Sequence, residues 1–160
     1  MQTLVLYDSR FGNTEAIARA IASGAAAGSS VTILDTEAAT HEQFAGPPDL
    51  VIVGGPTHNH GPSDGLKVLA DVVARRLPGV AAACFDTRYR GPVLLMGSGA
   101  ATTAKSLAKA GSLLVAPPES FYIVRKGSVA TQVLEPGEIE RAEAWGRAVL
   151  AAAPVEAVAG

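Results

Sequence analysis

Short runs of apolar, often β-branched residues alternate along the chain with longer stretches in which apolar residues recur every three or four positions. The first run, residues 3–7, is apolar almost throughout, which is typical of a central parallel strand buried on both faces. The other runs predict strands at residues 31–35, 49–54 and 79–85 and a fifth strand in two halves, 113–115 and 120–124.

The stretches between these runs have the spacing of amphipathic helices, which we expect at residues 13–27, 63–76, 99–110 and 137–152. Strands that alternate with helices form right-handed βαβ units and hence an open parallel sheet. The pattern therefore predicts a three-layer α/β/α sandwich on a five-stranded parallel sheet. We expect one domain over residues 1–153, followed by a short tail, 154–160.

The composition is that of a folded protein, because 48% of the 160 residues are hydrophobic and only 18% are charged. The sequence contains no apolar run long enough to span a bilayer and no secretory signal pattern, so we expect a cytoplasmic protein. A formal net charge of −2 gives no electrostatic reason to expect nucleic acid or membrane binding. The one cysteine, Cys84, excludes an internal disulfide framework and fits a small core residue in a strand.

Ligands of open parallel sheets bind at the carboxyl ends of the strands, which here means the loops 8–14, 55–63 and 86–98. The first loop leads into a helix, where unpaired backbone N–H groups and the positive dipole end attract an anion. Ser9 and Thr14 add hydroxyl donors, and Gly12 lets the backbone curl closely around a ligand. This pattern favours a phosphate site, although an ordinary capped turn uses the same residue types.

The same region resembles the flavodoxin signature at every defined position, namely Val5, Leu6, Tyr7, Ser9, Gly12, Thr14, Ala18 and Ile21. The layout of five strands resembles the flavodoxin-like fold over most of the chain. The resemblance implies the strand order 2-1-3-4-5 and a bound FMN. Its phosphate would then be surrounded by Ser9, Arg10, Phe11, Gly12, Asn13 and Thr14. Phe11 departs from the family, which often has a hydroxyl residue there.

By the same resemblance, the second loop would pack along the isoalloxazine ring through Pro56, Thr57, His58, Asn59, His60 and Gly61. His58 falls where the family often has Trp, and Asn59–His60 falls at the peptide whose carbonyl turns toward the reduced ring. The two histidines could instead be solvated loop residues, or could tune a flavin potential. A metal site is a further alternative, but the sequence offers no evident third ligand.

The third loop lacks the family's usual Gly-Thr-Gly-Asp run. The resemblance nevertheless implies that Asp86, Thr87, Arg88 and Tyr89 contact the flavin, with Tyr89 as the outer stacking ring. Either Arg88 or Arg90 near the ring would favour an anionic reduced flavin. The alternative is a surface loop whose arginines are simply solvated.

Together these features predict an FMN-binding protein of electron transfer that meets a redox partner protein or a small acceptor. One alternative is an FMN-dependent oxidoreductase that reduces a quinone with NAD(P)H. The other is a flavodoxin-like domain without FMN that acts in binding or regulation, which Phe11, His58 and the third loop would allow. A net charge of −2 gives little long-range steering toward a basic partner, unlike the strongly acidic carriers of the family.

Overall fold

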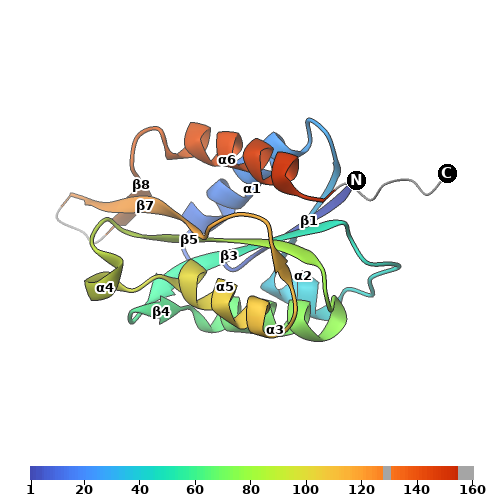
Figure 1. Cartoon of the computed structure of the whole chain (residues 1–160). Coiled ribbons are helices and arrows are strands. Elements are labelled where there is room, and N and C mark those ends of the chain that lie inside the picture. The colour runs from blue at the N-terminus through green and yellow to red at the C-terminus, as the bar shows by residue number, and fades with distance from the viewer. Residues whose placement is uncertain (128–130, 155–160) are drawn as a thin grey trace.

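The computed structural model describes residues 1–127 and 131–154 and shows helices on both faces of a central twisted sheet (Figure 1). Its elements are β1 (Gln2–Tyr7), α1 (Asn13–Ala25), β2 (Ser30–Asp35), α2 (Thr36–His41), β3 (Leu50–His58), β4 (Gly61–Pro62), α3 (Asp64–Arg76), β5 (Ala81–Tyr89), α4 (Val93–Met96), α5 (Gly99–Lys109), β6 (Leu113–Leu114), β7 (Glu119–Lys126), β8 (Thr131–Leu134) and α6 (Glu138–Ala152).

The sheet has the order β2-β1-β3-β5-β7-β8, with β4 paired to β3 and β6 paired to β5. Along this order the strands β2, β1, β3, β5 and β7 are parallel to one another, and since β5 and β7 are the fourth and fifth long strands, the order 2-1-3-4-5 is confirmed. Both β6 and β7 pair with β5, so the fifth strand is indeed made in two halves.

The expected five parallel strands are present, and at one edge the sheet has a further strand that was not predicted, β8, which pairs with β7 in the antiparallel direction. This strand was not predicted because its four residues are too few to show an alternation of apolar and polar side chains. It is held in place by its pairing with residues 123–126. The expected tail lies outside the described residues from residue 155 onward. Within the described residues, no helix combines the length and the apolar character needed to cross a membrane.

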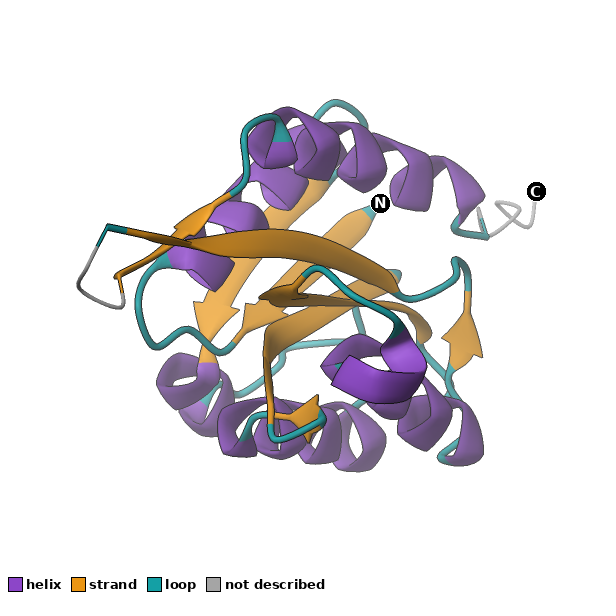
Figure 2. Ribbon diagram, turned by 90° about the vertical axis from the view of Figure 1, so that its left-hand side faces the viewer, coloured by secondary structure: helices purple, strands orange, loops and turns teal. Residues whose placement is uncertain are grey.

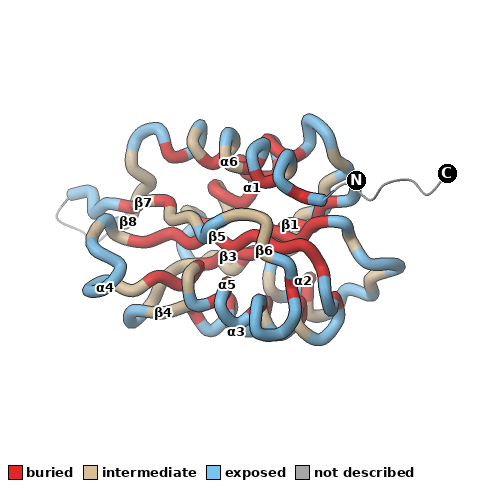
Figure 3. Tube along the Cα trace, in the orientation of Figure 1, coloured by how far each residue is buried: buried red, intermediate tan, exposed pale blue. Residues whose placement is uncertain are grey.

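The core consists of two apolar layers, one on each face of the sheet, and Figure 3 shows the buried strands between the exposed outer helices. Alternate residues of β1 face opposite layers: Val5 packs with α1 and α6, whereas Leu4 and Leu6 pack with α3 and α5. This is the period-two pattern of a strand covered on both sides. Cys84 is buried in the second layer, as expected for a core residue.

Two glycines allow α1 and α6 to cross at close range on one face of the sheet (Figure 1). A Cβ atom on Gly24 would lie 2.0 Å from the carbonyl oxygen of Glu143, and one on Gly146 would lie 2.2 Å from that of Ile21. Beneath this crossing Trp145 packs edge-on against Phe85 and Phe121. The crossing fixes α1, and therefore the loop that precedes it, against the sheet.

Two of the three expected loops are shorter than the sequence predicted, because strands extend into them. β3 continues to His58 and β5 continues to Tyr89. The pairing of Gly55 with Asp86 and of Pro56 with Thr87 carries the ladder beyond the apolar segments. In these extensions, neighbouring strands hold charged and small residues in an extended conformation. The local sequence does not predict this, because it depends on pairing with distant strands.

Candidate functional site

A cavity of about 500 Å³ opens at the carboxyl edge of the sheet, the end of the molecule that faces the viewer in Figure 2. Ligand sites commonly have volumes of about 300–1,000 Å³, so this one could hold a small cofactor. The cavity is lined by Arg10, Phe11, Asn13, Thr14, Pro56, Thr57, His58, Asn59, His60, Thr87, Arg88, Tyr89, Met96, Ile123 and Gln132.

The loop before α1 presents backbone donors to this cavity. Gly12 is the N-cap residue with φ +89°, a left-handed conformation that glycine adopts without strain. The amide N–H groups of Arg10, Phe11, Asn13 and Thr14 have no acceptor among the described residues. Four unpaired donors at the positive end of a helix dipole form a site for an anion.

Ser9 stabilises the loop from within instead of lining the cavity. Its Oγ accepts hydrogen bonds from the backbone N–H of Gly12 at 3.2 Å and of Glu15 at 3.3 Å. Phe11 is 70% exposed, so its ring does not fill the space between the amides. The side-chain amide of Asn13 donates to the carbonyl oxygen of Gln132 at 3.0 Å, which links the loop to β8.

Thr14 is positioned by a residue from the centre of the sheet. Its hydroxyl shares a buried hydrogen bond of 2.7 Å with the hydroxyl of Thr87 on β5. A hydroxyl has one proton and two lone pairs, so Thr14 can accept from Thr87 and still donate to an anion.

The second loop is a tight hairpin and not an irregular segment, since β3 and β4 pair directly. Its two central residues, Asn59 and His60, have φ values of 46° and 68°, as a two-residue turn of the type I′ class requires. A Cβ atom on Gly97 would lie 2.0 Å from the carbonyl oxygen of His60, so only glycine permits this contact. The segment that follows α4 therefore supports the hairpin turn.

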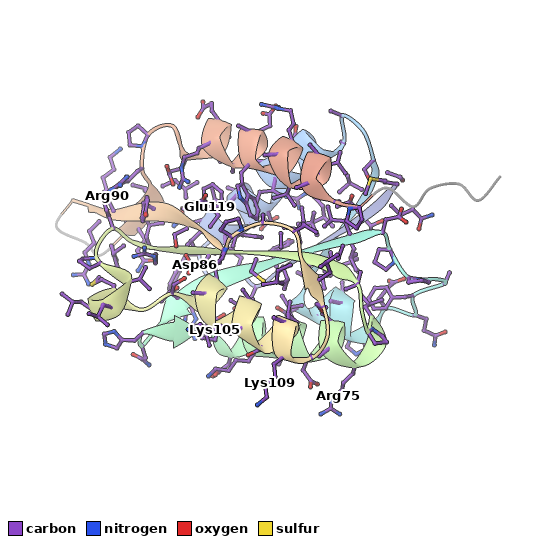
Figure 4. The ribbon with its side chains drawn as sticks, in the orientation of Figure 1. Arg75, Asp86, Arg90, Lys105, Lys109 and Glu119 are labelled. Atoms are coloured by element: carbon purple, nitrogen blue, oxygen red, sulfur yellow. The ribbon has the colours of Figure 1, made fainter. Side chains whose placement is uncertain are left out.

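Asp86, labelled in Figure 4, is fully buried and does not line the cavity, and its carboxylate accepts a hydrogen bond at the start of α5. Its Oδ2 accepts hydrogen bonds from the hydroxyls of Thr57 at 3.0 Å and Ser98 at 2.6 Å and from the amide of Ala100 at 2.9 Å. This carboxylate thereby fastens the hairpin and the α5 N-terminus to β5, so its side chain positions the cavity wall instead of lining it.

The two arginines of the third loop are not simply solvated. Arg88 lines the cavity, is 6% exposed, and donates to the hydroxyl of Ser120 and to two backbone carbonyls. Arg90 lies outside the cavity in an ion pair of 2.7 Å with Glu135, and this hydrogen bond raises the pKa of Arg90. Arg88 is thus a buried cation at the cavity wall, and its Nε lies 3.9 Å from the buried Asp86 carboxylate.

Most residues predicted for the site come together in the cavity, and the exceptions are Ser9, Gly12, Gly61 and Asp86. Sequence reasoning missed Met96, Ile123 and Gln132. Gln132 was missed because it belongs to strand β8, which was not predicted. Ile123 was missed because the sequence indicates only that it lies in a strand. Met96 lies on the short helix α4 inside a segment expected to be irregular.

The two histidines of the hairpin have no further metal-ligating side chains grouped with them in the described part of the chain. Among residues 1–127 and 131–154, no three side chains of His, Cys, Asp or Glu are grouped as a metal site requires. Both His58 and His60 line the cavity, with His58 half-buried and His60 exposed.

These features define a doubly wound α/β protein with a turn of unpaired backbone donors at the carboxyl edge of its sheet. The chain belongs to the flavodoxin family, whose sequence pattern matches residues 5–145. No curated protein matches the chain in sequence. Membership of this family implies a flavin cofactor.

Solved structures of similar fold include a flavodoxin from the domain Archaea, at 17% identity and a TM-score of 0.74, over 94% of this chain and 97% of that one. The WrbA-like protein of Agrobacterium tumefaciens has 22% identity and a TM-score of 0.67, over 94% and 95% of the two chains. The flavodiiron core of Flv1 from Synechocystis has 18% identity and a TM-score of 0.74, with 95% of this chain aligned. The chain spans only 36% of that flavodiiron core.

The residues of the cavity fit FMN, the flavin that the family implies. The four unpaired amides and the Thr14 hydroxyl match a phosphate dianion, which needs donors and no acceptors. Phe11 removes one hydroxyl donor that the family often has, but its backbone N–H remains in the loop. His58 and Tyr89, from two different strands, are available to lie beside a planar ring.

Proposed function

We propose that this chain binds FMN in the cavity at the carboxyl edge and transfers electrons between FMN and a redox partner. The observation that carries the proposal is the cluster of four unpaired backbone donors with Thr14 at the wall of a cavity of about 500 Å³. Bound FMN supplies the redox chemistry, because its ring system accepts and releases electrons.

The protein's own contribution is to bind, to orient and to set the local charge. The loop before α1 holds the phosphate, and the hairpin with His58 and the end of β5 with Tyr89 shape the space for the ring. The guanidinium of Arg88 is held in place by Ser120 and two carbonyls, and its Nε lies 3.9 Å from the buried carboxylate of Asp86. The nearby negative charge of Asp86 offsets much of the positive charge that Arg88 brings to the cavity.

The phosphate-specific part of the proposal is tested by titrating the ligand-free protein with FMN and with riboflavin, followed by flavin fluorescence. Several hydrogen bonds to a charged group, each contributing about 1.5–3 kcal/mol, should make FMN at least about a hundredfold tighter. Equal affinities, or no binding of FMN, would contradict the proposal.

The role of electron carrier is tested separately with the FMN-loaded protein. A carrier should oxidise neither NADH nor NADPH at a measurable rate in the presence of a quinone, since it needs a partner protein as donor. Steady turnover with quinone would instead assign the protein to the class of NAD(P)H-dependent reductases.

A further inference from the structure

The mouth of the cavity carries an unusual run of exposed apolar side chains. The whole of α4, Val93–Met96, is apolar, and Leu94 and Leu95 are 96% and 68% exposed. This helix stands at the same end of the molecule as β4 and the β7–β8 hairpin (Figures 1 and 3). Four consecutive exposed apolar residues lower solubility and are retained only where they serve a function.

The run is part of a wider apolar surface around the cavity. Met96 and Phe11 both line the cavity, and Phe11 is 70% exposed. The two residues come from α4 and from the loop before α1, so both elements border the same opening. The apolar residues therefore surround the route by which an electron partner would approach a flavin.

The charge at this mouth is positive, although the whole chain has a net charge of −2. Arg10 and Arg88 line the cavity and no described carboxylate does; Arg88 is paired with the buried Asp86, so the exposed positive charge comes from Arg10 and its neighbours. The guanidinium of Arg125 lies 5.8 Å from the ring centre of Tyr89 at the cavity wall, and Lys126 follows it. Arg10, Arg125 and Lys126 are exposed, and none of them forms an ion pair with a described residue.

Exposed cations elsewhere are often neutralised within their own helix. Arg19, Lys67, Arg75 and Arg147 each pair with a carboxylate three or four residues away. Arg10, Arg125 and Lys126 have no such partner among the described residues, so they remain able to steer a molecule of opposite charge.

We propose that the surface formed by Val93–Met96, Phe11, Arg10, Arg125 and Lys126 docks an acidic redox protein, with its apolar patch against α4 and its carboxylates against the three cations. The proposal rests on the proposed function, since it names the partner of the same site. A membrane is disfavoured as the occupant, because α4 has four residues and lacks the length and polar face of an interfacial helix.

The test measures binding, and not electron transfer, by isothermal titration calorimetry at low ionic strength. Two small redox proteins serve as probes: an acidic [2Fe–2S] ferredoxin and the basic protein cytochrome c. The ferredoxin should bind at least about tenfold more tightly, and its affinity should fall as salt is added.

Two variants separate the apolar contact from the charge. Leu94→Ser combined with Leu95→Ser should weaken ferredoxin binding about tenfold, because both side chains lose their apolar contact area. Arg125→Glu combined with Lys126→Glu should weaken it at least as much and shift the preference toward cytochrome c. The matched control is Lys105→Glu with Lys109→Glu on the outer side of α5 (Figure 4), which makes the same change in net charge away from this surface and should weaken ferredoxin binding far less than the variant at 125 and 126.

Failure of the docking proposal is distinguishable from failure of the proposed function, because FMN affinity is measured without any partner. Leu94 and Leu95 lie outside the cavity lining, so their double variant should bind FMN as the wild type does. A protein that binds FMN but not ferredoxin, or that prefers cytochrome c, overturns the docking proposal alone. The docking proposal is also overturned if the wild type binds anionic lipid vesicles, or self-associates in light scattering, and the leucine variant loses that binding.

Discussion

The hydroxyls of Thr14 and Thr87 share a buried hydrogen bond of 2.7 Å although 73 residues separate them in the chain. This bond joins the first turn of α1 to the central strand β5, the two elements between which the cavity opens. The orientation of the Thr14 hydroxyl is therefore set by the sheet and not only by its own loop.

Thr14→Val should lower the affinity for FMN by about 1–3 kcal/mol, because it removes a hydrogen bond to a charged group while keeping the shape of the side chain. Thr14→Ser keeps the hydroxyl and should remain close to the wild type. Fluorescence titration of all three proteins gives the dissociation constants. Equal affinities for the valine variant and the wild type would show that Thr14 does not contact the phosphate.

Gly146→Ala should destabilise the protein by about 1–3 kcal/mol, because its Cβ would lie 2.2 Å from the carbonyl oxygen of Ile21 and would push α1 and α6 apart. Helix propensity alone predicts the opposite sign, since alanine is favoured over glycine by about 1 kcal/mol. Urea unfolding decides between the two effects. Ser23→Ala, on the exposed side of α1, is the control and should stay within about 0.5 kcal/mol.

The thiol of Cys84 should be inert in the native protein. Burial in the sheet raises the pKa of this thiol to about 12, so the reactive thiolate is almost absent at neutral pH. A thiol-reactive chromophore should label Cys84 only after the protein is unfolded in urea. Rapid labelling of the folded protein would show that β5 opens far more readily than its burial implies.

A fall in pH should destabilise the protein partly because it protonates the side chain of Glu138. Desolvation acts to raise the pKa of this carboxyl, but hydrogen bonds from Arg141 and from the backbone of Tyr122 outweigh it, so the pKa is lowered. A carboxyl with a lowered pKa in the folded state stabilises the fold above its unfolded pKa of about 4.3. That contribution is lost as the pH falls through the folded pKa.

Glu138→Gln should therefore reduce the loss of unfolding free energy between neutral pH and about pH 3, as measured by urea unfolding across this range. Glu140→Gln is the matched variant, because it removes one negative charge from an exposed position of the same helix. If the glutamine variant at 138 keeps the full acid sensitivity of the wild type, the stabilising role of this carboxylate is refuted.

The four long helices could be predicted because their apolar residues recur every three or four positions, as in Ile17 to Ala25. The long strands could be predicted because they are short, nearly continuous apolar runs, as in residues 3–7. The loop before α1 was equally visible as a candidate site, since its residues are neighbours in sequence. What the sequence could not show depends on distant partners. Asp86 is extended and buried because β3, β7 and α5 surround it, and β8 exists because it pairs with β7.

The hairpin at Asn59 and His60 shows the same limit at smaller scale. Both residues tolerate left-handed backbone, so a turn was foreseeable, but its two-residue length depends on the register of β3 with β4. The position of the turn also depends on its contact with Gly97, which is distant from His60 in the sequence.

The central claim is that the backbone amides before α1 hold the phosphate of FMN. It is tested most directly by ¹H–¹⁵N correlation spectra of the labelled protein, recorded while FMN is added. The account predicts large downfield shifts of the amides of Arg10, Phe11, Asn13 and Thr14, which riboflavin does not reproduce. FMN that binds without moving these four resonances, or that does not bind, would contradict it.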